Sequence, residues 1–104
     1  MVHELLSGTY DLHIHTAPDV IPRKCTDEET VRRLEAAGMK GCAIKCHYFE
    51  TAARAALLQE RFPQMKIVGG LVLNRSVGGI NPEAVERFGQ MGGRMLWLSL
   101  IHIS

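Results

Sequence analysis

The sequence predicts an α/β fold in which four strands alternate with three helices in the order β-α-β-α-β-α-β. Segments in which apolar residues recur at every second position alternate with segments in which they fall on one helical face. The connections are short, with glycine and proline at the ends of elements, which favours a parallel sheet with right-handed crossovers. The strand ends recur at a similar interval, which suits the βα units of a barrel and an open doubly wound sheet equally.

The first strand is expected over residues 9–16, because apolar and polar residues alternate there. A capping box formed by Thr26 and Glu29 predicts the start of the first helix, and Gly38 predicts its end. The apolar face of this helix consists of Val31, Leu34 and Ala37.

The second strand is expected over residues 40–46 and the third over residues 66–74. The helix between them is expected to begin near Thr51 and to end at Pro63, because proline cannot continue a helix. One face of this helix carries Ala53, Ala56 and Leu57.

The third helix is expected to begin at Asn81, a plausible N-cap that is followed by Pro82 at the first helical position, and to end at Gly92. Its side chains expected to face the core are Val85 and Phe88. A fourth strand is expected to begin at residues 94–98.

The length and composition limit what the chain can be and what it can bind. It has 104 residues, whereas a complete (βα)8 barrel needs about 250, so a whole barrel is excluded. The formal net charge of +1 indicates neither nucleic acid nor a membrane surface as a partner. The three cysteines lack a paired spacing, and no leader-like or long apolar segment occurs. We therefore expect a soluble cytoplasmic protein with reduced thiols, whose partner is a small-molecule substrate.

The run Asp11-Leu12-His13-Ile14-His15 ends the first predicted strand and carries the main chemical signal. Side chains two positions apart on a strand share a face, so Asp11, His13 and His15 are expected to point away from the helices, into the lumen of a barrel. Imidazoles are good ligands for zinc and related ions. We expect His13 and His15 to bind a divalent metal, with Asp11 as a further ligand or as a group that orients His13. The alternative is an edge strand whose histidines face water.

The second strand offers further candidates by the same alternation. His47 is a third candidate ligand if it faces the lumen, and an exposed loop histidine otherwise. Lys45 would share that face and could bind substrate charge or act as a base, or it could form a structural hydrogen bond with a carboxylate. Cys42 and Cys46 are expected to pack against the helices as small apolar groups.

Asn74, at the end of the third strand, and Arg75 beside it are candidates for orienting a ligand or binding a substrate carboxylate or phosphate. The glycines before Asn81 are expected to shape the loop rather than to hold an anion. The polar residues His3, Arg23 and Lys24 are expected to be solvated surface.

The segment Tyr10-Asp11-Leu12-His13-Ile14-His15-Thr16-Ala17-Pro18-Asp19 resembles the opening of metal-dependent hydrolases of the amidohydrolase superfamily, and most closely an uncharacterised branch of it. The resemblance continues through Lys45-Cys46-His47-Tyr48, Leu73-Asn74 and Val77-Gly78-Gly79-Ile80-Asn81-Pro82, and covers residues 8–98.

This resemblance implies the N-terminal half of a TIM-like (βα)8 barrel. One or two divalent ions, zinc first, would activate a water molecule that attacks an amide, ester or related bond. The resemblance supports His13 and His15 as metal ligands, and supports His47 less. The later histidines and the catalytic aspartate of the superfamily lie on strands that this chain does not contain, and its bridging lysine normally lies on a later strand than Lys45. The catalytic base is therefore unassigned, and Lys45 is only a candidate.

Residues 1–98 are thus expected to form a partial barrel that is inactive alone, and residues 99–104 a non-native tail in which His102 has no role. One alternative is a phosphoesterase of the polymerase and histidinol phosphatase family, whose first motif also has an H-x-H. Another is a non-catalytic, metal-binding α/β module. The open edge of a half barrel would invite self-association.

Overall fold

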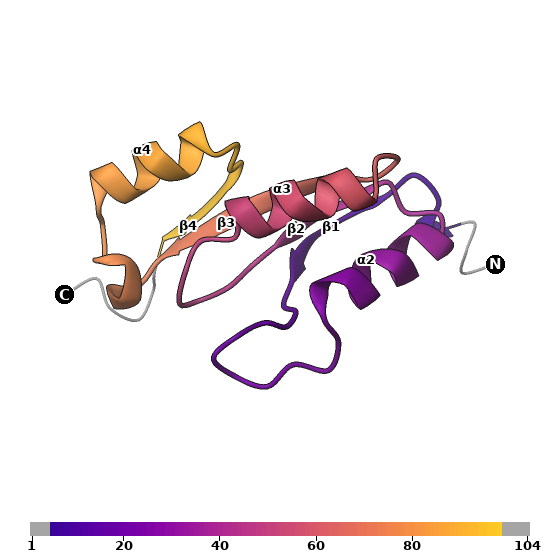
Figure 1. Ribbon diagram of the computed structural model, residues 1–104, viewed down its shortest axis with the longest axis horizontal. Helices are drawn as coiled ribbons and strands as arrows, with labels where there is room; N and C mark the ends of the chain where they lie inside the picture. The colour runs from indigo at the N-terminus through magenta and orange to yellow at the C-terminus, as the bar shows by residue number, and fades with distance from the viewer. Residues whose placement is uncertain (1–4, 99–104) are drawn as a thin grey trace.

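The computed structural model describes residues 5–98, which form a curled parallel sheet that alternates with helices (Figure 1). The strands are β1 (Tyr10–Ile14), β2 (Gly41–Ile44), β3 (Lys66–Leu73) and β4 (Met95–Leu98). The helices are α2 (Asp27–Ala36), α3 (Ala52–Arg61), the short 3-10 helix η1 (Arg75–Val77) and α4 (Pro82–Gln90). The predicted α/β class and the order of strands and helices are confirmed. The predictions for His3, His102 and the 99–104 tail lie outside the described residues.

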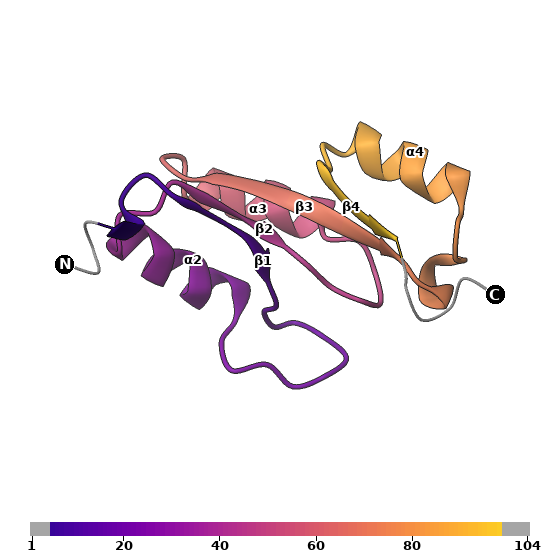
Figure 2. The ribbon, with the colours of Figure 1, turned by 180° about the vertical axis from the view of Figure 1, so that it is seen from behind.

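The strand order separates the two sheet types that the sequence left open. Each strand pairs in parallel with the next one along the chain, in the order β1-β2-β3-β4, and residues 5–98 contain no reversal of this order. A doubly wound sheet has such a reversal at its switch point. Right-handed crossovers that all advance in one direction place every helix on the same face. Figures 1 and 2 show the helices on one face of the sheet and the strands uncovered on the other.

The core lies between the sheet and this single layer of helices. The larger buried cluster joins α2, α3 and the sheet and consists of Val31, Cys42, Ile44, Ala55, Leu58, Phe62, Met65 and Ile67. A second cluster joins α4 to β3 and consists of Ala52, Leu71, Leu73 and Phe88. Because the helices bury only one face of the sheet, the other face is available for a functional site.

Local capping signals place two helices where the sequence predicts them. Thr26 and Glu29 form both hydrogen bonds of the capping box at the start of α2. The Asn81 side chain accepts a hydrogen bond from the Ala84 N–H at the start of α4, with Pro82 in the first turn. Four of the predicted inward residues of these two helices are buried or packed against the core, namely Val31, Leu34, Val85 and Phe88. The fifth, Ala37, is the half-buried C-cap of α2 and is not part of the core cluster.

The prediction of which face of α3 packs against the core is wrong. Leu57 is 68% exposed, and its predicted neighbours on that face are exposed as well. The buried residues are instead Ala52, Ala55 and Leu58. A Cβ atom on Gly69 would lie 2.4 Å from the Cα atom of Ala52, so the start of α3 approaches the backbone of β3 closely. An alanine-rich helix has two adjacent apolar faces, and this close approach selects between them.

Strand β1 contains an irregularity that changes which side chains share a face. Asp11 is in register with Cys42. Three residues further on, Ile14 is in register with Ile44, which lies only two residues beyond Cys42. This extra residue makes a β-bulge. Because residues in register on parallel strands point to the same face, Asp11 lies on the helix-covered face with Cys42. The prediction that Asp11 shares a face with the two histidines is therefore wrong.

Two of the three apolar side chains of β1 are exposed. Tyr10 is 48% exposed and Leu12 is 52% exposed, whereas both were expected to pack under the helices. Ile14, the third apolar residue of this strand, packs against the core. A Cβ atom on Gly41 would lie 2.8 Å from the ring of Tyr10, so this ring covers the glycine on the face opposite to the helices. The alternation of the sequence is thus interrupted within a single short strand.

Strand β4 forms one edge of the sheet and exposes apolar side chains there. Leu96 and Leu98 are 46% and 65% exposed and are in register with buried residues of β3. An unpaired edge with exposed apolar side chains favours pairing with another chain. We therefore expect the apparent molecular mass of the chain to rise with concentration in size-exclusion chromatography with light scattering. A monomer of constant mass over a wide range of concentrations would contradict this prediction.

None of the helices within residues 5–98 combines the length and the apolar character that crossing a membrane requires.

Candidate metal-binding site

The carboxyl ends of β1 and β2 lie side by side and bring the predicted histidines together. Pairing of the two strands continues to their ends, where the Lys45 N–H donates to the Ile14 carbonyl at 2.8 Å. Because the ends of parallel strands meet at one edge of the sheet, the residues that follow them become neighbours. His13 and His15 come from the end of β1, and His47 follows β2.

His13 and His15 face each other through their ring nitrogens. Their Nε2 atoms are 3.1 Å apart, and their rings are tilted by 60° with centroids 5.1 Å apart. His13 is exposed and His15 is half-buried. At this separation the two nitrogens can share a proton in a hydrogen bond, or both can direct their lone pairs to one cation.

His47 joins this pair without completing a three-ligand cluster. Its ring stacks on His15 with the centroids 5.1 Å apart and an angle of 15° between the planes. In the part of the chain that the structure describes, no three or more His, Cys, Asp or Glu side chains are grouped so as to hold a metal ion. The chain therefore gathers three imidazoles, of which two direct nitrogens at each other.

Asp11 supports the backbone of this strand end rather than an imidazole. Its carboxylate accepts a hydrogen bond from the His13 N–H at 3.1 Å, within the bulge. Burial and, to a lesser extent, the charge of Asp11 together raise the pKa of the Cys42 thiol to about 12. Cys42 is thus a neutral packing group, as predicted, and not a thiolate ligand.

Two residues that the sequence did not assign to a site, Asp19 and Arg23, lie close to the strand ends. The side chain of Asp19 is fully buried, and it accepts a hydrogen bond from the Arg23 Nε at 2.8 Å. Asp19 also accepts a hydrogen bond from the Cys46 thiol at 3.5 Å. Cys46 immediately precedes His47 in the chain. The prediction that Arg23 is solvated surface is wrong, because its side chain is only 21% exposed. The i,i+4 spacing of the two charges was the available sequence signal.

The charge of Asp19 is stabilised despite its burial. Burial raises the pKa of this carboxyl, but the hydrogen bonds from Arg23, the Val20 N–H and the Cys46 thiol outweigh it, so the pKa is lowered overall. Asp19 and Arg23 therefore form an ion pair at neutral pH that holds the loop after β1 over the end of β2.

Lys45 contacts an aromatic ring rather than a carboxylate. Its Nζ lies 4.8 Å from the ring centroid of Trp97, and the His13 ring lies 6.3 Å from the same ring. A Cβ atom on Gly70 would lie 2.3 Å from the Trp97 ring, so this ring covers the glycine in β3. Trp97 is a site residue that the sequence reasoning missed. Its alternation with Leu96 and Leu98 was the signal that could have found it.

The two remaining candidates have different surroundings. The Asn74 side chain donates to the His47 carbonyl at 2.8 Å, so it fixes the position of the loop that carries His47. Arg75 is exposed at the start of η1, and no hydrogen bond or ion pair joins it to the histidines within residues 5–98. Asn74 therefore lies at the site and supports the loop that carries His47, whereas Arg75 is not joined to the site.

Arg54 connects the residue after His15 to two helices. From α3, its Nη2 atom donates to both the carbonyl and the hydroxyl of Thr16 at 3.3 Å. Its Nε atom lies 3.3 Å from the carboxylate of Asp27, at the start of α2. Thr16 is 2% exposed, so these hydrogen bonds satisfy buried groups. Sequence reasoning missed Arg54, whose role depends on contacts between distant segments.

The electrostatic surroundings keep two of the histidines neutral. Burial lowers the pKa of His15 below its ordinary 6.5, and the charges of Arg23, the other two histidines and Lys45 lower it further. Burial, Lys45 and Arg23 lower the pKa of His47 as well, against the opposing effect of Asp19. Neutral imidazole is the form that binds metals.

These lowered pKa values predict that the metal-free protein becomes less stable in acid. Between 6.5 and the lower pKa of the folded state, the unfolded chain binds protons on His15 and His47 that the folded chain does not. The free energy of unfolding should therefore decrease as the pH falls below 6.5 and should level off above it. Urea unfolding at a series of pH values between about 5 and 8 measures this.

A His15→Asn, His47→Asn double variant should show a flatter dependence in this range. The ion pair of Asp19 does not contribute, because its carboxyl has an ordinary pKa of 3.8 that is lowered further. Stability that is constant or that rises on acidification of the wild-type chain would contradict the electrostatic account.

The separation of the two ring nitrogens at the strand ends fits a divalent metal. Two nitrogens that bind one zinc ion tetrahedrally at about 2.0–2.1 Å lie about 3.4 Å apart, close to the 3.1 Å between the Nε2 atoms of His13 and His15. The Nδ1 atom of His15 is buried and has no hydrogen-bond partner among the described residues. With a metal at Nε2, this Nδ1 atom would carry the ring proton, and the described residues offer it no hydrogen-bond acceptor of the kind that usually orients a ligating imidazole.

Comparison with known proteins places the chain in a family without assigning it an activity. A family model described as a family of unknown function, DUF6282, matches residues 8–103. Searches of the curated proteins and of the solved structures found no match. The match covers the strands, the helices and the histidine-bearing strand ends described above, and the chain belongs to the DUF6282 family.

Proposed function

We propose that this chain is part of a metal-dependent hydrolase of the amidohydrolase type, with its sheet as the N-terminal half of a TIM-like (βα)8 barrel. The observation that carries the proposal is the pair of Nε2 atoms, 3.1 Å apart, at the carboxyl ends of parallel strands. In (βα)8 barrels the active site lies at this end of the strands. The one-directional strand order and the single layer of helices suit a barrel as well.

The residues in the proposed site have separate tasks. His13 and His15 would hold the ion, and His47 lies close enough to act as a third ligand after a rotation of its side chain. A divalent ion bound there would supply Lewis acidity and lower the pKa of a water molecule towards neutrality. Asp11, Asn74 and Arg54 would fix the backbone segments that carry the three rings. The resemblance places the base and the bridging lysine on later strands.

A phosphoesterase of the polymerase and histidinol phosphatase type is the second candidate. The observation that favours it is the presence of two cationic side chains, Arg23 and Lys45, near the histidines. Arginine and lysine are common ligands of phosphate groups. A non-catalytic metal-binding module remains the third possibility, with the same ligands and no turnover.

Hydrolysis assays with the complete product of the gene and with the 104-residue chain test the proposal. Both are treated with a chelator, reloaded with zinc, and offered a panel of simple amides, esters and phosphoesters. We expect the complete product to cleave amides or esters, to lose this activity with the chelator or the His13→Ala substitution, and to keep it with Glu60→Ala on α3. We expect the chain alone to be inactive.

The other outcomes of these assays are equally informative. Cleavage of phosphoesters alone would establish the second candidate instead. A complete product that binds zinc but cleaves nothing in the panel would contradict a hydrolase and support the non-catalytic module.

A further inference from the structure

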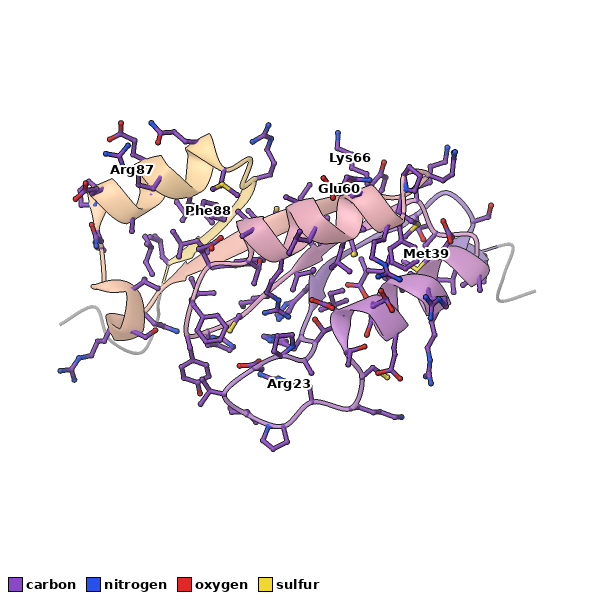
Figure 3. The ribbon with its side chains drawn as sticks, in the orientation of Figure 1. Arg23, Met39, Glu60, Lys66, Arg87 and Phe88 are labelled. Atoms are coloured by element: carbon purple, nitrogen blue, oxygen red, sulfur yellow. The ribbon has the colours of Figure 1, made fainter. Side chains whose placement is uncertain are left out.

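The guanidinium of Arg23 is bound through its Nε atom, whereas its two Nη atoms form no hydrogen bond with the described residues. Its Nε atom is occupied by the buried Asp19 carboxylate at 2.8 Å, which also accepts from the Cys46 thiol and so fixes the arginine beside the end of β2. No hydrogen bond joins its Nη1 or Nη2 atom to another side chain or backbone group of the described residues. Figure 3 shows Arg23 within the outline of the loop that follows β1.

Lys45 adds a second positive charge near His13. Its ammonium lies over the ring of Trp97, which also lies beside His13. The ion pairs formed among residues 5–98 do not include Lys45, so no carboxylate neutralises it there. A cation over an aromatic face keeps its charge while its position is restricted.

The side chains around the histidines therefore carry an excess of positive charge. Asp19 neutralises Arg23, whereas no carboxylate of the described residues forms an ion pair with Lys45. A bound divalent ion would increase the positive charge. A guanidinium with a free edge suits a planar or tetrahedral oxyanion, because its N–H groups can donate to two oxygens at once.

We propose that Arg23 and Lys45 form a subsite that binds an oxyanion of the substrate, a carboxylate or a phosphate group, beside His13, His15 and His47. The inference rests on the proposed function for its claim that the anion belongs to a substrate. The subsite itself consists of side chains that are in place without a metal. It gives Arg23 a specificity-determining task in addition to its ion pair with Asp19.

The single tryptophan of the chain provides the readout. Trp97 contacts Lys45, so an anion that binds there should change its fluorescence. Inorganic phosphate and acetate are titrated into the chelator-treated 104-residue chain at constant ionic strength, with chloride as the non-binding reference. We expect a saturable change with phosphate or acetate and none with chloride. The anion that binds more tightly identifies the substrate group as phosphate or carboxylate.

Matched variants test the two cations separately. Arg23→Lys keeps a positive charge that can pair with Asp19 but removes the planar guanidinium that can donate to two oxygens at once. Lys45→Met removes the positive charge of Lys45. Each should weaken anion binding roughly tenfold or more. The controls are Arg87→Lys on α4 and Lys66→Met at the start of β3, which lie far from Arg23 in Figure 3 and should bind as the wild type does.

The outcomes separate this inference from the proposed function. A wild-type response no larger than that to chloride, or unchanged affinity in both site variants, would overturn the subsite, whether or not zinc binds. Anion binding that depends on Arg23 in a chain that fails to bind zinc would uphold the subsite and contradict the proposed function alone.

Discussion

The His13→Ala, His15→Ala double variant is expected to bind zinc at least about 100-fold more weakly than the wild-type chain. Zinc sites with four protein ligands bind with about 10–16 kcal/mol, so each imidazole contributes roughly 3 kcal/mol, a factor of about 100 in affinity. The Nε2 atoms of the two rings lie 3.1 Å apart, so a zinc ion held by both would lose both ligands in the double variant. Competition titrations with a chelator of known zinc affinity measure the effect.

Two single variants serve as comparisons for this titration. His47→Ala should weaken zinc binding less than either of the other histidine substitutions, because its ring stacks on His15 and is not part of the Nε2 pair. Glu60→Ala on α3 should have no effect. A double variant that binds zinc as tightly as the wild type would show that His13 and His15 are not the ligands.

The Thr51→Val variant is expected to lose about 2–4 kcal/mol of unfolding free energy. Thr51 is fully buried beside the end of β2 and the middle of β3, where its hydroxyl donates to the Ile44 carbonyl and accepts from the Gly70 N–H, both at 2.7 Å. Valine has nearly the same shape but leaves these two buried backbone groups without a partner. Urea denaturation followed by circular dichroism measures the loss.

Thr51→Ser provides the matched control, because it keeps the hydroxyl and removes only a methyl group. It should retain most of the stability that Thr51→Val loses. Equal destabilisation by the two substitutions would show that packing of the methyl group, rather than the hydrogen bonds, makes this position important.

Much of the fold follows from signals that act over a few residues. The capping box at Thr26 and the Asn81-Pro82 pair place the starts of α2 and α4, since each motif satisfies N–H groups of its own helix. The motif that ends with His15 and the position of His47 after β2 predict that the histidines meet, because consecutive parallel strands place their carboxyl ends at one edge. These predictions need no knowledge of distant contacts.

The predictions that are wrong depend on contacts between distant segments. The face of Asp11 is changed by a bulge that is defined only against β2, so a perfect alternation in the sequence does not reveal it. The inward face of α3 is selected by its close approach to Gly69 in β3. Arg23 is held at the site by its ion pair with Asp19. The Asp19 carboxylate is buried and accepts a hydrogen bond from the Cys46 thiol, which follows β2. Local patterns therefore predicted the elements and the histidines, whereas the supporting side chains required the fold.

X-ray absorption at the zinc edge of the zinc-loaded chain tests most directly whether the strand-end histidines hold the metal. The account predicts at least two imidazole nitrogens at about 2.0–2.1 Å from zinc, with the imidazole scattering reduced in the His13→Ala, His15→Ala variant. A wild-type spectrum dominated by sulfur at about 2.3 Å, or by oxygen without imidazole, would place the metal elsewhere and contradict the account.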